Sequence, residues 1–232
     1  MQTIHDRPML DQYIRRFALD AIFDPPLTDR MELCRFEKGE LICASSATLR
    51  HMFFQVAGKV KISSFLENGK SLLLRFNKPL SILGDVEYLN QFPVHCNVES
   101  VTATLLIAVR FEDLNRFAYD NPKFLRFIIE NLSGKLYRTS ISASINLLYP
   151  LEKRLASYLL SIGSDENNLP CGNDIMTLKM TEIAAFLGTS YRHLNRVINT
   201  LRAKNVLTKQ TGVIQIADFE KLKELSDGTL YE

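Results

Sequence analysis

Residues 181–216 read TEIAAFLGTSYRHLNRVINTLRAKNVLTKQTGVIQI, and this stretch decides the fold of the C-terminal part of the chain. Ile183 and Leu187 are four residues apart, the spacing of one face of a helix. Gly188 interrupts the pattern and supplies the positive φ that a helix-ending turn requires. Ser190 is a suitable N-cap for a second helix. We interpret the stretch as two short helices joined by a tight turn and followed by a β-hairpin.

The second helix, residues 190–204, has two different faces. Its apolar residues recur at helical spacing and predict a buried side formed by Leu194, Val197, Ile198 and Leu201. At about 100° per residue, the opposite side carries Arg192, Asn195, Arg196 and Asn199. An arginine matches the paired acceptors of guanine, and asparagine suits adenine or a phosphate. The outward face therefore predicts contact with DNA.

Charge around this helix supports that interpretation. Residues 183–217 contain no Asp or Glu, whereas five side chains are basic: Arg192, Arg196, Arg202, Lys204 and Lys209. The whole chain has a formal net charge of only +2, so its phosphate-binding surface must be local. In a helix-turn-helix the second helix enters the major groove. The hairpin tip at Lys209, Gln210 and Thr211 suits a wing that touches the backbone.

Length and composition indicate two domains with real cores. The chain has 232 residues, of which 46% are hydrophobic. Its first residues, MQTIHDRPMLDQYIRRF, show no secretory signal, and its uncharged apolar runs are shorter than a membrane span. We expect a soluble, cytoplasmic protein.

Cysteine and histidine spacing predicts no metal site. Cys34, Cys43, Cys96 and Cys171 form no CxxC pair, and the four histidines are scattered. We expect reduced, mostly buried thiols.

The N-terminal half changes from helical to β periodicity. Residues 1–30 are predicted to be helical and irregular, and residues 31–110 contain short β-rich segments separated by turn signals. Asn68-Gly69 between apolar runs predicts a two-residue hairpin. Many short strands at such spacing favour an antiparallel barrel or sandwich.

A long helix is predicted over residues 122–149. Pro122 suits its first turn, and Tyr149-Pro150 ends it and marks a domain boundary. Steps of four and three residues define a heptad-like seam, predicted to form a dimer contact: Leu125, Ile129, Leu132, Leu136, Thr139, Ala143 and Asn146. The alternative is a helix packed only on its own barrel. Further helices are predicted at residues 151–162 and 218–225, the latter capped by Asp218.

This order of elements resembles the cyclic-AMP receptor protein/FNR (Crp/Fnr) family of bacterial transcription regulators. The resemblance covers nearly the whole chain, and its most specific part is EIAAFLGTSYRHLNRVINTLRAKNVL, in which GTSYRHL is similar to the YeiL-like branch. It implies an α+β fold with three parts: a β-roll sensor domain at residues 1–121, a dimerisation helix at 122–149 and a winged helix-turn-helix at 150–232. It also implies a homodimer on a pseudo-palindromic operator, with RNA polymerase as a further partner.

The resemblance assigns DNA contacts to the turn, the second helix and the wing. The candidate DNA-binding residues are Thr189, Ser190, Tyr191, Arg192, His193, Asn195, Arg196, Asn199, Lys209 and Gln210. Arg192 stands where many family members have Glu, so we expect an operator different from the familiar receptor-protein site.

The candidate effector pocket departs from the family pattern. Its candidate residues are Gly84, Asp85, Glu87, Val94 and His95. Cyclic-AMP-binding members place an arginine where this chain has Pro93-Val94-His95-Cys96, and a buried phosphate without a cationic partner is costly. We therefore expect no cyclic AMP and, because the N-terminal cysteine cluster of FNR is absent, no iron–sulfur cluster. A haem ligand at His51 or His95 and a redox role for Cys96 are alternatives that the sequence disfavours.

Two other classes of protein compete with a DNA-binding regulator. A cupin-like β-barrel enzyme needs convergent metal ligands, but the barrel region offers only the distant His51 and His95. The second alternative is a β-roll that serves only as a protein-interaction module and has lost DNA binding. We expect no enzymatic activity and no cofactor.

Overall fold

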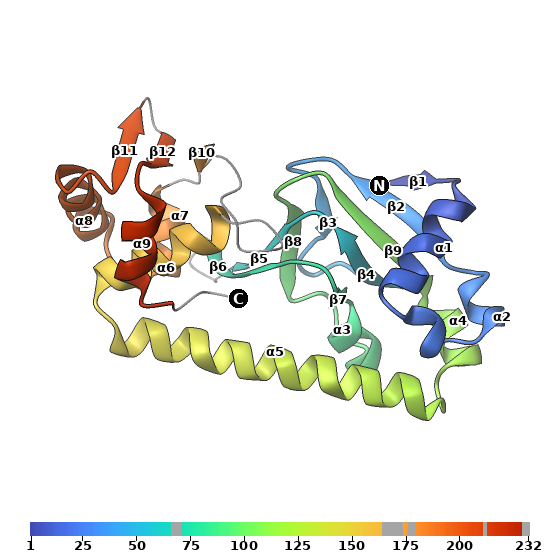
Figure 1. Cartoon of the computed structure of the whole chain (residues 1–232). Helices are drawn as coiled ribbons and strands as arrows, with labels where there is room; N and C mark the ends of the chain where they lie inside the picture. Colours follow the sequence, from blue (N-terminus) through green and yellow to red (C-terminus); the bar gives the residue numbers. More distant parts are fainter. Residues whose placement is uncertain (66–70, 164–173, 176–179, 211–212, 229–232) are drawn as a thin grey trace. The chain divides into compact units, whose positions relative to one another are not determined.

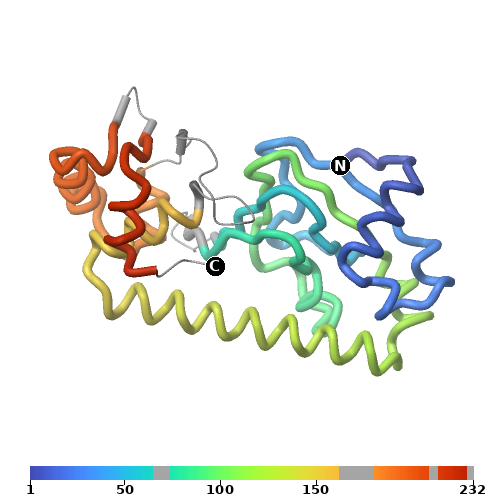
Figure 2. The backbone as a smooth tube through the Cα atoms, in the orientation of Figure 1, coloured from blue at the N-terminus to red at the C-terminus, as the bar shows by residue number. Residues whose placement is uncertain are grey.

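The computed structural model describes residues 1–65, 71–163, 174–175, 180–210 and 213–228, which fall into two compact units (Figures 1 and 2). The first unit comprises Met1–Phe65 and Asn77–Leu136, and the second comprises Leu66–Phe76 and Tyr137–Glu232. The 27-residue helix α5 (Pro122–Leu148) contributes to both. Among the described residues no helix, α5 included, has the length and apolarity needed to cross a membrane.

The first unit is built on antiparallel sheets. One sheet has the order β1–β2–β9–β4–β7, and in the other β8 lies between β3 and β5. Their bounds are β1 (Gln2–Ile4), β2 (Glu32–Phe36), β3 (Leu41–Cys43), β4 (His51–Ala57), β5 (Val60–Phe65), β7 (Ser81–Leu83), β8 (Cys96–Ser100) and β9 (Thr104–Arg110). The predicted antiparallel β architecture, long helix and C-terminal helix-turn-helix are confirmed.

Strands β4 and β9 are buried on both faces. Successive side chains point to opposite faces of a sheet, and each face of these strands meets a different core cluster. On β4, Met52 and Phe54 belong to one core cluster, whereas Phe53 belongs to the other. On β9, Ile107 and Leu106 divide between the same two clusters. The two strands therefore read as nearly continuous apolar runs, and each joins two cores.

Short helices cover one of these cores. They are α1 (Arg7–Arg16), the 3₁₀ turn η1 (Leu19–Ala21), α2 (Pro25–Thr28), α3 (Asp85–Asn90) and α4 (Phe111–Phe117). Asp6 caps the N-terminus of α1, and its side chain accepts from the Met9 N–H at 2.9 Å. The ring of Phe23 lies 5.7 Å from that of Phe54 and 5.4 Å from that of Phe124. This aromatic contact joins the N-terminal helices, the sheet and the start of α5.

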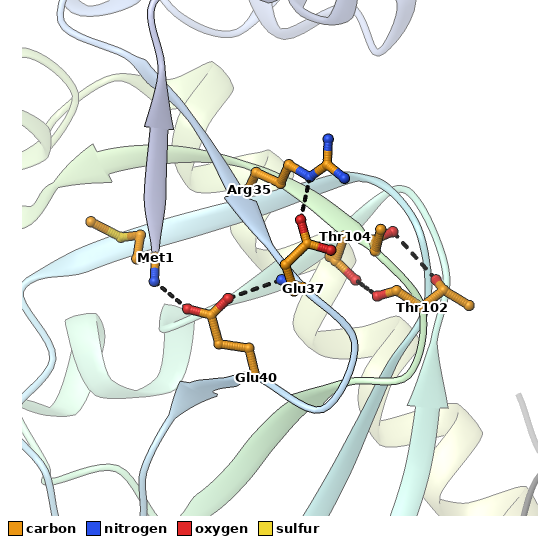
Figure 3. A network of polar contacts seen from close by, with 7 residues as sticks. Met1, Arg35, Glu37, Glu40, Thr102 and Thr104 are labelled. Carbon is orange, nitrogen blue, oxygen red and sulfur yellow. Dashed lines mark hydrogen bonds and ion pairs between the residues drawn. The ribbon is translucent and has the colours of Figure 1, made fainter.

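Polar contacts cluster near the ends of β1, β2 and β9 (Figure 3). The Met1 ammonium pairs with Glu40, which also accepts from the Glu37 N–H at 2.9 Å. Arg35 Nε lies 2.8 Å from Glu37 Oε1, and the Thr104 hydroxyl donates to the Thr102 carbonyl at 2.9 Å. Exposed ion pairs contribute little stability each. The backbone hydrogen bonds between β1 and β2 are therefore the main interaction that holds β1 to the sheet.

The second unit packs its helices around α6 (Leu151–Gly163). The remaining elements are β6 (Ser71–Asn77), β10 (Asp174–Ile175), α7 (Met180–Phe186), α8 (Tyr191–Ala203), β11 (Leu207–Gln210), β12 (Val213–Ile216) and α9 (Phe219–Ser226). The last residue of β6, Asn77, belongs to the first unit. Tyr158 of α6 is fully buried, and its ring centroid lies 6.1 Å from that of Phe76 and 5.2 Å from that of Phe186. Asp218 caps α9 by accepting from the Lys221 N–H at 3.0 Å, as predicted.

Some predictions of local structure need correction. Strands β1 and β7 were not predicted, because β1 lies in the stretch expected to be helical and irregular and β7 runs into the turn signal at Gly84. Val197 is half-buried rather than buried. The Asn68-Gly69 hairpin and Cys171 lie outside the described residues.

Gly58 allows a close approach between two backbone segments. Its φ is +84°, and a Cβ there would lie 2.4 Å from the Ala103 carbonyl oxygen. Gly39 has almost the same φ, +81°, but a Cβ added at Gly39 would meet no other atom within 4 Å. The two glycines therefore separate backbone strain from steric overlap.

We expect Gly39→Ala to lower the free energy of unfolding by about 1–2 kcal/mol through the left-handed backbone alone. Gly58→Ala should lower it by a further 1–3 kcal/mol or so, because the backbone must also shift to make room. Urea denaturation followed by circular dichroism measures both. Equal losses for the two variants would contradict the steric argument.

Candidate nucleic-acid interface

The turn between α7 and α8 has the hydrogen bonds of a glycine-ended helix. Gly188 has φ +59°, and its N–H donates to the Ala185 carbonyl at 3.1 Å. The Thr189 N–H donates to the Ala184 carbonyl at 2.9 Å. These bonds satisfy carbonyls that the end of α7 would otherwise leave free. The chain can therefore leave α7 and begin α8 within a few residues.

Helix α8 begins at the predicted N-cap. The Ser190 side-chain oxygen accepts from the His193 N–H at 3.2 Å. Three apolar side chains on one face are fully buried: Leu194, Ile198 and Leu201. Their spacing fixes which side of the helix packs inward, as the sequence pattern predicted.

The other side of α8 is exposed and cationic. Its exposed side chains are Tyr191, Arg192, His193, Arg196 and Asn199, whereas Thr189 and Asn195 are half-buried. Within the described part of the chain, neither Arg192 nor Arg196 has an ion-pair partner. Thr189 Oγ1 lies 3.4 Å from His193 Nδ1, so these two side chains meet at the start of the helix. Two guanidinium groups one turn apart are thus available to an anionic ligand.

A β-hairpin follows α8 in the position of a wing. Strands β11 and β12 pair antiparallel, with Lys209 opposite Ile214 and Gln210 opposite Val213. Strand β10 extends this small sheet on the far side of β12. The backbone thus places Lys209 and Gln210 toward the tip, while their side chains lie outside the described residues.

The candidate effector residues lie around β7, α3 and the start of β8. Gly84, Asp85 and Val94 are buried, Glu87 is half-buried and His95 is exposed. The Val94 N–H donates to the Ala47 carbonyl at 3.0 Å, and its carbonyl accepts from the Ser46 N–H at 2.7 Å. An apolar side chain is therefore buried within the segment where the family resemblance implies an arginine.

Asp85 has a partner that the sequence did not reveal. Lys135 Nζ, on α5, lies 2.7 and 2.6 Å from the two Asp85 carboxylate oxygens and donates to the Ile82 carbonyl at 2.8 Å. Only 2% of the Asp85 side chain is exposed. A buried carboxylate requires such compensation, because losing water without a partner is costly. Both oxygens of Asp85 thus bind an internal cation.

The buried thiols have little thiolate character. Burial, the largest cause, raises the pKa of Cys34, and it raises the pKa of Cys43 to about 12. Cys96 is half-buried and packs against the core cluster that contains Cys34 and Cys43. Burial also lowers the pKa of His51, so its ring is held neutral at physiological pH. Cys34 and Cys43 are therefore poor nucleophiles in the folded state.

Helix α5 leaves much of its predicted seam exposed. Exposure reaches 64% at Ile129 and 70% at Leu136, and Leu125, Thr139 and Ala143 are exposed as well. Asn146 is half-buried, and Leu132 packs partly against the core of the first unit. On other sides of the helix Phe124, Ile128 and Ile145 are buried. Helix α5 thus packs on its own chain and still presents an uncovered apolar stripe.

Comparisons with known proteins match both halves of the chain. Residues 33–121 match the cyclic nucleotide-binding domain, and residues 153–225 match the Crp-like helix-turn-helix domain. Regulatory protein YeiL of Escherichia coli O157:H7 is 26% identical over 175 residues, which cover 75% of this chain and 76% of that protein. A CRP-like cAMP-activated global transcriptional regulator of Mycobacterium tuberculosis is 21% identical, covering 92% and 98%.

A solved structure shares the fold. A CRP-family transcriptional regulator of Thermus thermophilus aligns with a TM-score of 0.68 and 20% identity. The alignment covers 86% of this chain and 98% of that one. The order of domains, and not only the helix-turn-helix, is therefore shared.

The N-cap of α8 can be tested by itself. We expect Ser190→Ala to lower the free energy of unfolding by about 1 kcal/mol, because the His193 N–H loses its acceptor. Ser190→Asp keeps an acceptor and should retain the stability of the parent protein. Urea denaturation of the three proteins measures the effect, and identical midpoints for all three would contradict it.

Proposed function

This chain belongs to the Crp/Fnr family of transcription regulators, and on that premise we propose that it acts as a homodimer that reads a pseudo-palindromic operator with α8. The observation that carries the proposal is the capped helix α8, whose apolar face is buried and whose cationic face is exposed. Because its partner is then chromosomal DNA, we expect the protein in the cytoplasm.

Arg192 and Arg196 are the proposed base-reading residues. Both are exposed on α8, and a guanidinium can donate two parallel hydrogen bonds to guanine N7 and O6. Tyr191 and Asn195 complete the proposed reading face. The Ser190 oxygen accepts from the backbone, so its hydroxyl proton is left for a phosphate oxygen.

The remaining candidate residues are proposed to position the duplex. Thr189, His193 and Asn199 border the reading face. Lys209 and Gln210 lie on the hairpin that forms the wing and would contact the DNA backbone. Contacts of this kind fix the register on the backbone without reading sequence. RNA polymerase is proposed as a further partner once the operator is bound.

The uncovered stripe on α5 supports the homodimer. A second copy of α5 would bury Ile129 and Leu136 against each other's helix, and a two-fold axis would pair the two α8 helices. Dimers of helix-turn-helix proteins bind half-sites about one DNA turn apart. The stripe thus supplies the symmetry that a pseudo-palindrome requires.

We further propose that cyclic nucleotide does not control this regulator. The first unit matches the cyclic nucleotide-binding family, but the residues present fit an anionic ligand poorly. Val94 is buried in the segment where the resemblance implies an arginine, and Lys135 is held by Asp85. The relative from M. tuberculosis is described as cAMP-activated, so the proposal sets this chain apart from it. Neither an iron–sulfur cluster nor haem is proposed.

Selection of bound sequences from a random DNA pool tests the operator proposal. We expect a two-fold symmetric site, and a recovered site without symmetry would contradict the paired-helix arrangement. Titration of cyclic AMP into the same binding reaction should leave the affinity within twofold. A larger cyclic-AMP-dependent gain would overturn the proposed independence while leaving DNA binding intact.

The reading arginines can be tested on the selected site. We expect Arg192→Ala or Arg196→Ala to cost about 1–3 kcal/mol per half-site and to relax the preference at one base pair. Fluorescence anisotropy with specific and random duplexes measures the ratio. Arg35→Ala, an exposed arginine of the first sheet, is the matched control. An unchanged ratio in both α8 variants would refute their reading role.

The dimer face can be tested without disturbing the core. Ile129→Glu places a charge on an exposed stripe position and should shift the sedimentation coefficient to that of a monomer while the helical circular dichroism signal is retained. Lys123→Glu, on another exposed side of α5, is the matched control and should stay dimeric. A dimeric Ile129→Glu protein would exclude the stripe as the interface.

A further inference from the structure

We propose that Arg154 is a positioning residue for DNA binding, because its guanidinium ties the helix-turn-helix turn to the last turn of α5. Arg154 lies near the start of α6, between these two segments in the chain. This inference rests on the proposed function, since it explains how α8 is held in place. No sequence motif pointed to it.

The contacts of Arg154 join two helix ends. Its Nη1 donates to the Asn146 carbonyl at 3.2 Å, near the end of α5, and to the Leu187 carbonyl just after α7. The Asn146 side-chain amide also donates to the Phe186 carbonyl at 3.4 Å. The end of α5 and the end of α7 are therefore joined twice, and all these residues belong to the second unit.

The acceptors explain why arginine suits this place. The last carbonyls of a helix lack intrahelical partners and form the negative end of its dipole. One guanidinium donates in several directions of a plane, so it satisfies carbonyls from two helices at once. A lysine ammonium is a compact point charge on a flexible stem and holds such a geometry less firmly.

The position of Leu187 determines where the reading helix α8 begins. Gly188 follows it, a Cβ at Gly188 would lie 3.7 Å from Arg154 Nη1, and Ser190 already caps α8. A shift of the Leu187 carbonyl therefore moves the N-terminus of α8, where the proposed base contacts begin. In a dimer built on α5, the separation of the two α8 helices then depends on this clamp.

The test compares three variants with one control. Arg154→Met removes the guanidinium, and Arg154→Lys keeps the charge but not the planar fork. Asn146→Ala removes the second link and leaves the Asn146 backbone carbonyl in place for Arg154. Lys153→Met is the control, because it removes the same charge at the preceding position, where Lys153 pairs with Asp227 and not with these helix ends. Circular dichroism establishes that each protein is folded, and Asn146→Ala and Arg154→Lys keep the test informative if Arg154→Met does not fold.

Amide hydrogen exchange in the free protein is the first measurement. We expect exchange at Gly188 and Thr189 to accelerate at least tenfold in both Arg154 variants, less in Asn146→Ala, and not in Lys153→Met. Exchange at wild-type rates in every variant overturns the clamp. This measurement needs no DNA, so it decides the clamp even if the wild-type protein binds no operator and the proposed function fails.

Binding to duplexes with altered half-site spacing is the second measurement. The wild type should prefer its selected spacing over a spacing changed by one base pair. We expect the ratio of affinities for the two spacings to fall at least tenfold in Arg154→Lys and Arg154→Met. Their affinity for random duplex at low salt should stay within twofold of the wild type. Faster exchange with an unchanged spacing preference would overturn the positioning role, because Arg154 would then only stabilise the turn.

Discussion

Burial of Leu194, Ile198 and Leu201 decides which side of α8 meets solvent. Because these residues recur at helical spacing, inserting them into the core of the second unit leaves the arginines no other direction than outward. The N-cap at Ser190 and the turn at Gly188 then fix where the helix starts. The chemistry of the exposed face therefore depends on the packing of the hidden one.

The first unit obeys the same logic with a different period. Alternation along β4 and β9 sends neighbouring side chains into two cores, so a shift of one residue in register would exchange both sets. Its core also buries Phe124 and Ile128, and so packs the start of α5 against the first unit. Within this domain, which matches the cyclic nucleotide-binding family, the buried pair formed by Asp85 and Lys135 links α3 to α5.

Local signals made the helix-turn-helix predictable from sequence, whereas long-range polar contacts were not. The helical period, the glycine turn and the serine cap each act within a few residues, and α8 and α9 were predicted with their capping residues. Lys135 and Asp85 are separated by 50 positions, and no local pattern relates them. Arg154 binds backbone carbonyls, which every residue type offers, so its partners carry no signature in the sequence.

The raised pKa values of Cys34 and Cys43 have a practical consequence. An electrophile in solution meets these sulfurs only when the sheets part, so the rate of their alkylation counts the opening events of the first unit. Alkylation of Cys34 and Cys43 therefore reports how often the first unit opens, and the alkylating reagent itself is the only label required.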